Sequence, residues 1–210
     1  DEAFSKGLKS YFKKYGWSNT VFDDFINEMI AAAGDKLSNL KDLCNLWLQK
    51  AGLNEISLTM EVDPNTKLIT KFVVNQKPCL EEHPNLITHM VDFLFIYDFE
   101  DLTKNKVFEK QLMENKPETV FDFSKELAPK VVFLNYNDYG YRKLDFDKRS
   151  LEGLKQGLPS LKDALTKQSI YRSVFDQMRD GKFTSVEYVE LAFELMHTET
   201  NDNNLSLDRD

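Results

Sequence analysis

Histidine and cysteine are the side chains here that could most readily bind a metal ion or act as a nucleophile, and the chain has three and two of them. His83 and His89 flank Pro84, so a metal ion shared by the two imidazoles is one interpretation. The alternative, which the pattern favours, is a loop histidine followed by a strand histidine. His197 falls near the end of an expected helix, where an imidazolium group suits the helix dipole.

The spacing of these residues matches no catalytic motif. No His-Glu-x-x-His run presents two imidazoles on one helix face, no glycine-rich loop could hold a phosphate group, and no Gly-x-Ser-x-Gly turn is present. Cys44 lies in an apolar helical pattern with Leu43 and Trp47, which predicts a buried thiol rather than a nucleophile. We therefore predict no catalytic, metal-binding or substrate-binding residue within this chain.

Acidic and aromatic clusters offer weaker possibilities. The pairs Glu81-Glu82 and Glu100-Asp101 could bind calcium, but they lack the alternating spacing of a calcium loop, which favours a solvated surface. The aromatic run Phe93–Phe99 could be a binding surface, although its period of two is more typical of a core strand. Trp17 and Trp47 could each anchor a ligand, and packing between helices is the simpler interpretation.

The composition is that of a soluble globular protein. The 210 residues are 41% hydrophobic and 30% charged, and the formal net charge is -8. This acidic balance argues against nucleic acid as a partner, because phosphate binding needs clustered Lys and Arg. No stretch approaches the roughly 18 apolar residues of a membrane helix, and the first residues do not resemble a signal peptide. Two cysteines make no disulfide framework, which favours a reducing, cytoplasmic compartment.

Periodicity divides the chain into helices, strands and helices again. Helical patterns cover 4–15, 22–33 and 38–51, with Ser18 or Asn19 as the cap of the second helix. After 148, helices are expected over 149–157, behind a Ser160 cap, and behind the capping box Thr184-x-x-Glu187. Between them, alternation of apolar and polar residues predicts seven short strands over 56–62, 68–74, 86–98, 107–113, 119–123, 130–135 and 139–146.

This order of elements predicts a multi-part α+β fold: a helical segment, an antiparallel β-sandwich of about seven strands, and a second helical segment. We expect these parts to cover 1–53, 54–146 and 147–210. Three helices rarely bury their apolar faces alone, so we expect apolar faces within 3–51 and 160–197 to be partly exposed. Both ends of the chain are expected to be cuts inside a longer protein.

Several segments, taken in order, resemble zinc aminopeptidases of the aminopeptidase N type. The segments before the strands resemble the end of that family's catalytic domain, and the later ones resemble its last sandwich strands and the start of its C-terminal helical domain. The matching segments are Gly7–Phe12, Tyr15–Thr20, Asp23–Phe25, Leu46–Asn54, Val132–Tyr141, Arg149–Leu151, Met178–Tyr188 and Glu199-Thr200.

The resemblance implies a parent enzyme that removes amino-terminal residues from peptides, with zinc activating a water molecule and a glutamate acting as general base. The family's His-Glu-x-x-His and Gly-x-Met-Glu-Asn motifs do not occur here and would lie before Asp1, so we carry over no catalytic or zinc-binding residue. The sandwich would link the catalytic domain to a helical cap, with the rest of the polypeptide and peptide substrates as partners. The alternative is a zinc-free relative that acts as a scaffold or protein-interaction module.

Overall fold

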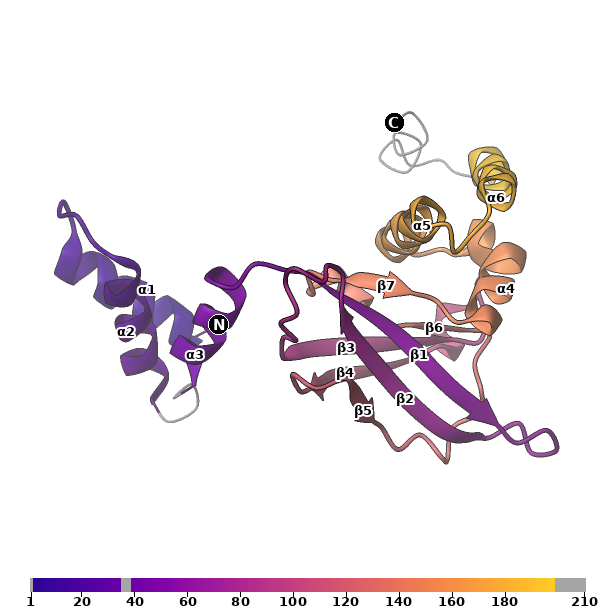
Figure 1. Ribbon diagram of the computed structural model, residues 1–210, viewed down its shortest axis with the longest axis horizontal. Helices are drawn as coiled ribbons and strands as arrows, with labels where there is room; N and C mark the ends of the chain where they lie inside the picture. The colour runs from indigo at the N-terminus through magenta and orange to yellow at the C-terminus, as the bar shows by residue number, and fades with distance from the viewer. Residues whose placement is uncertain (1, 35–38, 199–210) are drawn as a thin grey trace. The chain divides into compact units, whose positions relative to one another are not determined.

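The computed structural model describes residues 2–34 and 39–198. Within these ranges it contains six α-helices and seven strands, which fall into two compact units, one ending at Ala51 and the other beginning at Gly52. The elements, labelled in Figure 1, are α1 Glu2–Tyr15, α2 Phe22–Ala33, α3 Leu40–Leu48, β1 Asn54–Val62, β2 Ile69–Pro78, β3 His89–Ile96, η2 Leu102–Lys104, β4 Lys106–Met113, β5 Glu118–Val120, β6 Val131–Phe133, η3 Tyr136–Asp138, β7 Lys143–Asp145, α4 Lys148–Gly157, η4 Leu158–Ser160, α5 Ala164–Arg179 and α6 Ser185–Thr198.

In the first unit, α1 and α2 pack closely at a glycine. Gly7 is buried in α1, and a Cβ atom at this position would lie 2.7 Å from the sulfur of Met29 on α2. Glu28, the neighbour of Met29, accepts a 2.8 Å hydrogen bond at Oε1 from the Lys14 ammonium group, and this ion pair links α1 to α2. The absence of a side chain at Gly7 therefore sets how near the helices can approach.

The cap of α2 differs from the prediction. The helix begins after Val21, whose amide donates to the Asp24 carboxylate at 3.0 Å, so neither Ser18 nor Asn19 caps it. The Asp24 carboxylate therefore satisfies the amide of Val21, the residue before the helix, while the Asp24 amide donates to the Val21 carbonyl oxygen at 3.1 Å. The predicted end at Gly34 is confirmed, because this residue caps the helix with a positive φ of 62°.

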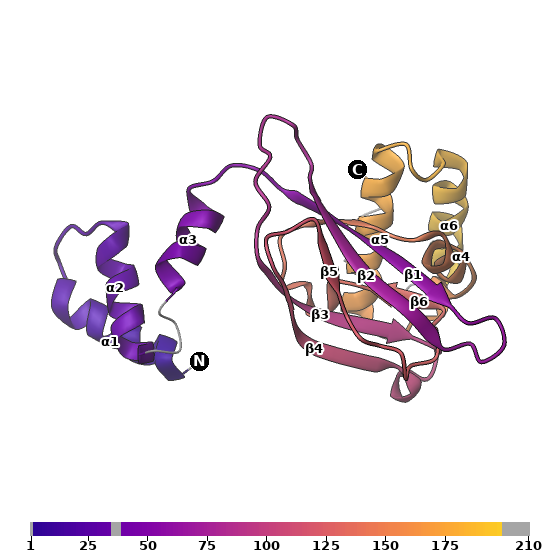
Figure 2. The ribbon, with the colours of Figure 1, turned by 60° about the horizontal axis from the view of Figure 1, so that its bottom comes forward.

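Two sheets build the strand region of the second unit, and their strand orders are β5-β2-β1-β7 and β4-β3-β6. Strands β1 and β2 form the predicted hairpin, paired antiparallel from Asn54 and Pro78 to Val62 and Ile69. In Figures 1 and 2, these two strands cross over β3 and β4, as expected for the two layers of a sandwich. The predicted α+β fold, with helices before and after the strand region, is confirmed.

One strand pair departs from the antiparallel expectation. β7 lies beside β1 and runs parallel to it, with Glu55 opposite Lys143 and Ser57 opposite Asp145. The other strand pairs of the two sheets are antiparallel. The first and last strands of the sandwich are therefore neighbours.

Phenylalanine side chains fill the space between the sheets. Phe93 and Phe95 of β3 have no exposed surface, which confirms that the aromatic run is a core strand. Phe72 of β2 packs edge-to-face on Phe123 with ring centroids 4.8 Å apart, and Phe95 packs on Phe108 at the same distance. Such pairs add about 0.5–1.5 kcal/mol each beyond the burial of their area.

Helices α4 to α6 share this core rather than forming a separate one. Leu154, Leu158 and Ile170 are buried in the same cluster as the strand residues. At the join, the amide of Val132 donates to Ser150 Oγ at 3.0 Å. A Cβ atom at Gly157 would lie 2.1 Å from the ring of Phe99, so the glycine allows α4 to approach the strand region. The second unit is thus one continuous hydrophobic body.

The predicted strands 86–98, 119–123, 130–135 and 139–146 are all shorter in the structure, and for the first and last of these the difference has the same physical reason. The last one is limited to β7, because the Asn135 side chain bonds both the amide and the carbonyl of Gly140 at 3.2 Å and holds the preceding residues in a loop. The predicted strand 86–98 begins only at His89. The amide of Ile87 donates to Asn54 Oδ1, and its carbonyl accepts from Gln76, so its backbone groups are already satisfied by side chains.

The caps of the later helices were predicted with mixed success. Asp163 caps α5 by accepting from the amides of Leu165 and Thr166, so the predicted Ser160 cap was wrong, and Ser160 lies in η4 instead. The capping box of α6 is confirmed, because the amide of Glu187 donates to Thr184 Oγ1 and the amide of Thr184 donates to the Glu187 carboxylate, each at 3.2 Å. Asp163 caps α5 in place of Ser160 because its carboxylate accepts from two amides of the first turn.

The third helix is also shorter than the predicted 38–51. α3 covers Leu40–Leu48, and Ser38 lies outside the described residues. Cys44 is half-buried in it, so the predicted core thiol was wrong. Partial burial nevertheless raises the pKa of this thiol, which keeps it protonated near neutral pH.

Candidate functional site

A large hollow of the second unit lies between the loop before β7 and one face of α5. Its volume is about 580 Å³. The loop contributes Tyr139 and Tyr141, which are 79% and 75% exposed, and α5 contributes Arg172. The other residues along this groove are Leu53, Asn135, Asp138, Gly140, Arg142, Lys143, Leu165, Gln168, Ser169, Ser173 and Asp176.

Asn135 holds the loop that forms one wall of the groove. Its amide group bonds Asp138 and both backbone groups of Gly140, and its Oδ1 accepts from the guanidinium group of Arg142. Asn137 and Asp138 adopt positive φ angles of 64° and 52°, which side chains other than glycine rarely do. A network of polar contacts therefore fixes an otherwise strained loop.

Polar and charged side chains make up most of the groove lining. Tyrosine rings, amides, hydroxyls, guanidinium groups, the carboxylates of Asp138 and Asp176 and the ammonium group of Lys143 line it, but neither histidine nor cysteine does. Its serine hydroxyls thus have no imidazole to act as a general base. This arrangement could hold a polar chain or another protein surface.

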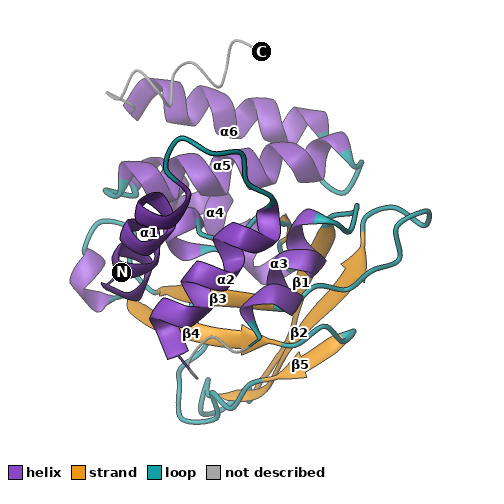
Figure 3. Cartoon of the chain, turned by 90° about the vertical axis from the view of Figure 1, so that its left-hand side faces the viewer, coloured by secondary structure: helices purple, strands orange, loops and turns teal. Residues whose placement is uncertain are grey.

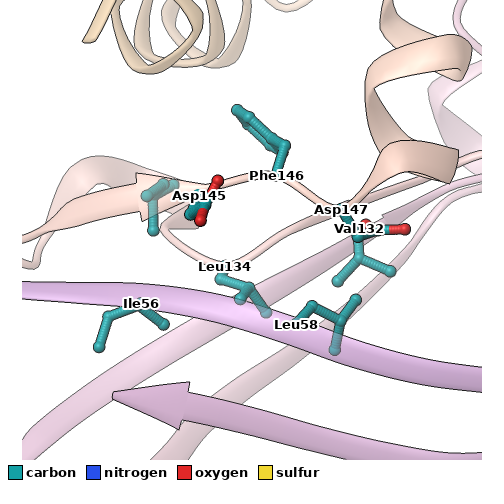
Figure 4. A pocket seen from close by; sticks show the side chains of 8 residues that line it. Ile56, Leu58, Val132, Leu134, Asp145, Phe146 and Asp147 are labelled. Carbon is teal, nitrogen blue, oxygen red and sulfur yellow. The ribbon is translucent and has the colours of Figure 1, made fainter. Parts of the chain in front are cut away.

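A second, much smaller cavity lies inside the sandwich, where β1 approaches β6 and β7. Its volume is about 10 Å³, enough for about one water molecule. In Figure 4, Ile56 and Leu58 of β1 lie on one side of it, with Asp145, Phe146 and Asp147 on the other. The remaining lining residues are Val132, Leu134 and Leu144. This cavity is too small to admit a substrate.

The structure separates the three histidines by environment. His89 lies on β3 with 2% of its surface exposed, while His83 lies in the preceding loop and is half-buried, so the loop-and-strand interpretation is confirmed. Burial lowers the pKa of His89 to about 4, and the positive charge of Arg142 adds to this effect. His197 lies in the last turn of α6, where Nδ1 is 2.7 Å from the Phe193 carbonyl oxygen.

The environment of His89 does not suit a divalent cation, because a neighbouring guanidinium group would repel it. Within 2–34 and 39–198, no group of three His, Cys, Asp or Glu side chains is arranged to hold a metal ion. The described residues therefore do not fit a zinc site.

The acidic and tryptophan residues considered in the sequence are exposed or only partly buried. Glu100 and Asp101 lie in a turn where both their amides donate to Asp98 Oδ1, which is the surface role expected for them. Trp47 is half-buried in α3. Trp17 is fully exposed with a positive φ of 67°, so the predicted packing between helices was wrong for this residue.

Sequence patterns gave no indication of a buried ionic network in the second unit. Glu55 of β1 has only 8% of its side chain exposed, and its carboxylate accepts from Lys182 at 2.6 Å and pairs with Lys77 at 2.9 Å. Lys182 also donates to Asp145 of β7 at 2.7 Å. Alternation alone could not reveal it, since Glu55 precedes the predicted strand 56–62 and, as the neighbour of inward-facing Ile56, is assigned to the opposite face of the sheet.

None of the helices in the described part of the chain is both long enough and apolar enough to cross a membrane. No family model matches the chain. Among curated proteins, the chain is 27% identical over 198 residues to an aminopeptidase N of Streptomyces lividans, an alignment that covers 91% of this chain and 22% of the relative.

Two shorter similarities agree with this one. An aminopeptidase N of Lactococcus lactis subsp. lactis is 38% identical over 71 residues, and a puromycin-sensitive aminopeptidase of Caenorhabditis elegans is 29% identical over 70 residues. They cover 34% and 33% of this chain, and 8% and 7% of the relatives. The chain thus spans about a fifth or less of each relative's length.

The expected resemblance is confirmed. The chain, an α+β protein with a central sandwich, is similar over nearly its whole length to a segment of a protein of the aminopeptidase N type. The similarity concerns one region of a much longer protein.

Proposed function

We propose that this chain is a non-catalytic portion of a zinc-dependent aminopeptidase that removes amino-terminal residues from peptides. The observation that carries the proposal is the similarity, over 91% of the chain, to a protein named aminopeptidase N. The zinc ligands and the general base would then lie in other parts of the parent polypeptide, since the described residues do not fit a metal site. Peptide substrates would be met through the parent.

The proposed parts of the chain follow from the sequence. Residues 1–53 would be the helical end of a catalytic domain, 54–146 the β-sandwich, and 147–210 the start of a C-terminal helical domain. The sandwich would link the other two. The core that β-strands and α4 to α6 share supports a stiff link, because a continuous hydrophobic body resists bending between its parts.

Cytoplasmic location is part of the proposal. Both cysteines, Cys44 and Cys79, are free thiols, as expected of a protein in a reducing compartment. Burial is the main cause of the raised pKa of Cys79, and the nearby charge of Glu55 adds to it. A higher pKa leaves less of this cysteine as thiolate, which is the form that is oxidised, so the thiol is protected from oxidation.

A zinc-free scaffold is the second candidate. The observation in its favour is the number of large apolar side chains at the surface, among them Trp17 at 108% and Phe12 at 65% exposure. Exposed apolar surface of this kind is typical of protein-interaction sites. The two candidate functions predict different properties of the parent polypeptide. It hydrolyses peptides if the chain is a segment of an enzyme, and it does not if the chain belongs to a scaffold.

The test compares the parent polypeptide with the 210-residue chain. Each is assayed for release of p-nitroaniline from aminoacyl p-nitroanilides, and bound zinc is measured after dialysis. We expect zinc and activity in the parent, loss of activity with a chelator, and neither property in the 210-residue chain. A parent that binds peptides without hydrolysing them, and holds no zinc, would establish the scaffold instead.

A further inference from the structure

One carboxylate oxygen in the second unit is buried without a hydrogen-bond partner among the described residues. It is Oδ1 of Asp147, the residue that precedes α4. The other oxygen of this carboxylate, Oδ2, accepts from the amide of Ser150 at 3.4 Å in the first turn of the helix. Burial of an acceptor is costly when no donor replaces the water that it bonded in the unfolded chain. Asp147 Oδ1 therefore needs a donor from outside the described residues.

A small ligand has room to bind here, because Asp147 lines the small cavity inside the sandwich. Figure 4 shows it with Asp145 among the side chains that surround this cavity. Bulk solvent does not reach Asp147 Oδ1, since the atom is buried. The volume of the cavity, about 10 Å³, is about what one water molecule requires, so a larger donor does not fit.

Most of the cavity wall is apolar, and its two acidic side chains decide what it can bind. The apolar lining residues are Ile56, Leu58, Val132, Leu134, Leu144 and Phe146. Cavities with purely apolar walls stay dry. Here Asp145 accepts from Gln177 at 2.6 Å and from Lys182 at 2.7 Å, and a carboxylate oxygen can accept a further hydrogen bond. Two carboxylates that only accept are matched by a ligand with two donors, which water has.

We propose that one water molecule binds in this cavity and donates one hydrogen bond to Asp147 Oδ1 and the other to the Asp145 carboxylate. Of the strands that line the cavity, β1 and β7 belong to one sheet and β6 belongs to the other. α4 begins at the same place, and in Figure 3 the helices α4 to α6 lie together on one side of the strands. The water therefore lies where both sheets meet the start of these helices.

Other occupants fit this cavity less well. Hard cations such as Ca²⁺ and Mg²⁺ take about six or more oxygen ligands, whereas hydrocarbon side chains form most of this wall. Lys182 also offsets the charge of Asp145, which weakens the attraction for a second cation. A surface of a longer protein does not reach the cavity, because its apolar lining residues are 9% exposed or less. The inference goes beyond the proposed function and does not depend on it.

Nuclear magnetic resonance of the full 210-residue chain, with labelled methyl groups, detects the water directly. The methyl groups of Leu58 and Leu134 should show cross-peaks at the water frequency, with opposite signs in NOESY and ROESY spectra because a bound water tumbles with the protein. Val132 is not used as a reporter, since its amide donates to the Ser150 hydroxyl, which exchanges its own proton with water. Val120, which is 73% exposed and meets bulk water only briefly, is the control and should lack these cross-peaks.

A methyl group added to the cavity wall tests the hydrogen bond to Asp147. Val132→Ile should displace the water, so the water cross-peaks of Leu58 and Leu134 should disappear. Asp147 Oδ1 then loses its donor, and the midpoint of urea unfolding should fall. Val74→Ile is the matched control, because Val74 is also buried but does not line the cavity, and the cross-peaks should remain.

A second background separates the lost hydrogen bond from overpacking. Asp147→Ser keeps a residue that favours the start of a helix but removes the oxygen Oδ1. In this background, Val132→Ile should no longer lower the midpoint, because no acceptor is left to lose its donor. An equal fall in both backgrounds would overturn the proposal, since overpacking alone would then explain it.

Other results would also overturn the proposal. Absence of the cross-peaks from Leu58 and Leu134, or a higher midpoint for Val132→Ile, would mean that the cavity is dry, because filling a dry cavity stabilises a protein. A midpoint that rises when sodium chloride replaces choline chloride, in the unaltered chain but not in Asp147→Ser, would make a cation the occupant. None of these results bears on whether the parent hydrolyses peptides.

Discussion

Lys182, in the turn after α5, donates a 2.6 Å hydrogen bond to Glu55 on β1, although 126 residues lie between them in the sequence. The same ammonium group bonds Asp145 on β7. One side chain thus joins the helices to the first and last strands of the sandwich.

Removing this ammonium group should destabilise the second unit. In Lys182→Met, the buried Glu55 carboxylate keeps only Lys77 as a cationic partner, and Asp145 loses one. We expect the free energy of unfolding to fall by about 1–3 kcal/mol, below the full cost of breaking a buried pair because Lys77 remains. Urea unfolding followed by circular dichroism measures it.

The matched control is Lys71→Met, which breaks an ion pair with Glu61 where both side chains are about half exposed. Exposed pairs contribute little, so we expect no measurable change. Equal effects of the two substitutions would show that the Lys182 network is not special.

The amide side chain of Asn54 is a second point of sensitivity. Its Oδ1 accepts from Gln76 and from the amide of Ile87, both at 2.9 Å, and its Nδ2 donates to the Asn85 carbonyl at 2.8 Å. Asn54→Leu leaves these groups unsatisfied in a buried position, so we expect a loss of about 2–4 kcal/mol. Asn75→Leu breaks only an exposed bond to Thr59 and should change stability far less.

Hydrogen exchange measures the same effect locally. In Asn54→Leu, the amide of Ile87 should exchange much faster than in the unaltered chain, because its acceptor is gone. Unchanged protection of this amide would mean that the loop before β3 is held by other contacts.

Stability should depend on pH through His89. Its pKa is lowered from 6.5 to about 4 in the folded chain, so the unfolded chain binds more protons between these values. The free energy of unfolding should therefore be highest above pH 6.5 and fall as the pH drops towards 4, by about 3 kcal/mol from this group.

Urea unfolding of His89→Gln over this pH range should show a much shallower slope. His197→Gln, which removes an exposed imidazole on α6, should keep the original slope. If His89→Gln retains the whole dependence, other groups carry it and the buried histidine stays charged as readily as a free one.

Gly157 should not tolerate a side chain. Alanine normally stabilises a helix by about 1 kcal/mol relative to glycine. At Gly157, however, the added Cβ would lie 2.1 Å from the buried Phe99 ring, so we expect Gly157→Ala to lower the melting temperature. Lys148→Ala, at an exposed position of the same helix, is the control and should shift it little. A more stable Gly157→Ala would mean that α4 can move away from Phe99 freely.

Alternation and helical periodicity were sufficient to predict the order of elements. The hairpin of β1 and β2 follows from the alternation of Ile56 and Leu58 with polar residues, because one buried face fixes which residues point inward. The core position of Phe93 and Phe95 follows from the same period. Both predictions depend only on the alternation of neighbouring residues, which the rest of the chain does not change.

Errors arose where side chains replace backbone partners. No periodic pattern in the sequence reveals that Asn135 would bond both backbone groups of Gly140, five residues further on, or that Asn54 and Gln76 would hold the distant Ile87. Pairing of β7 with β1 and the buried charge of Glu55 likewise depend on residues far away in the chain. For the groove beside α5, the residues were visible in the sequence, but their assembly from a loop and a helix was not.

The parallel pairing of β1 and β7 has a mechanical consequence. Tension applied to the chain at Gly52 and Asp147 would pull the first strand backwards and the last strand forwards along each other. Their hydrogen bonds would be loaded together in shear instead of breaking one by one, as they would in a hairpin pulled from its open end. The sandwich is therefore built to carry force between the segments on its two sides without unravelling.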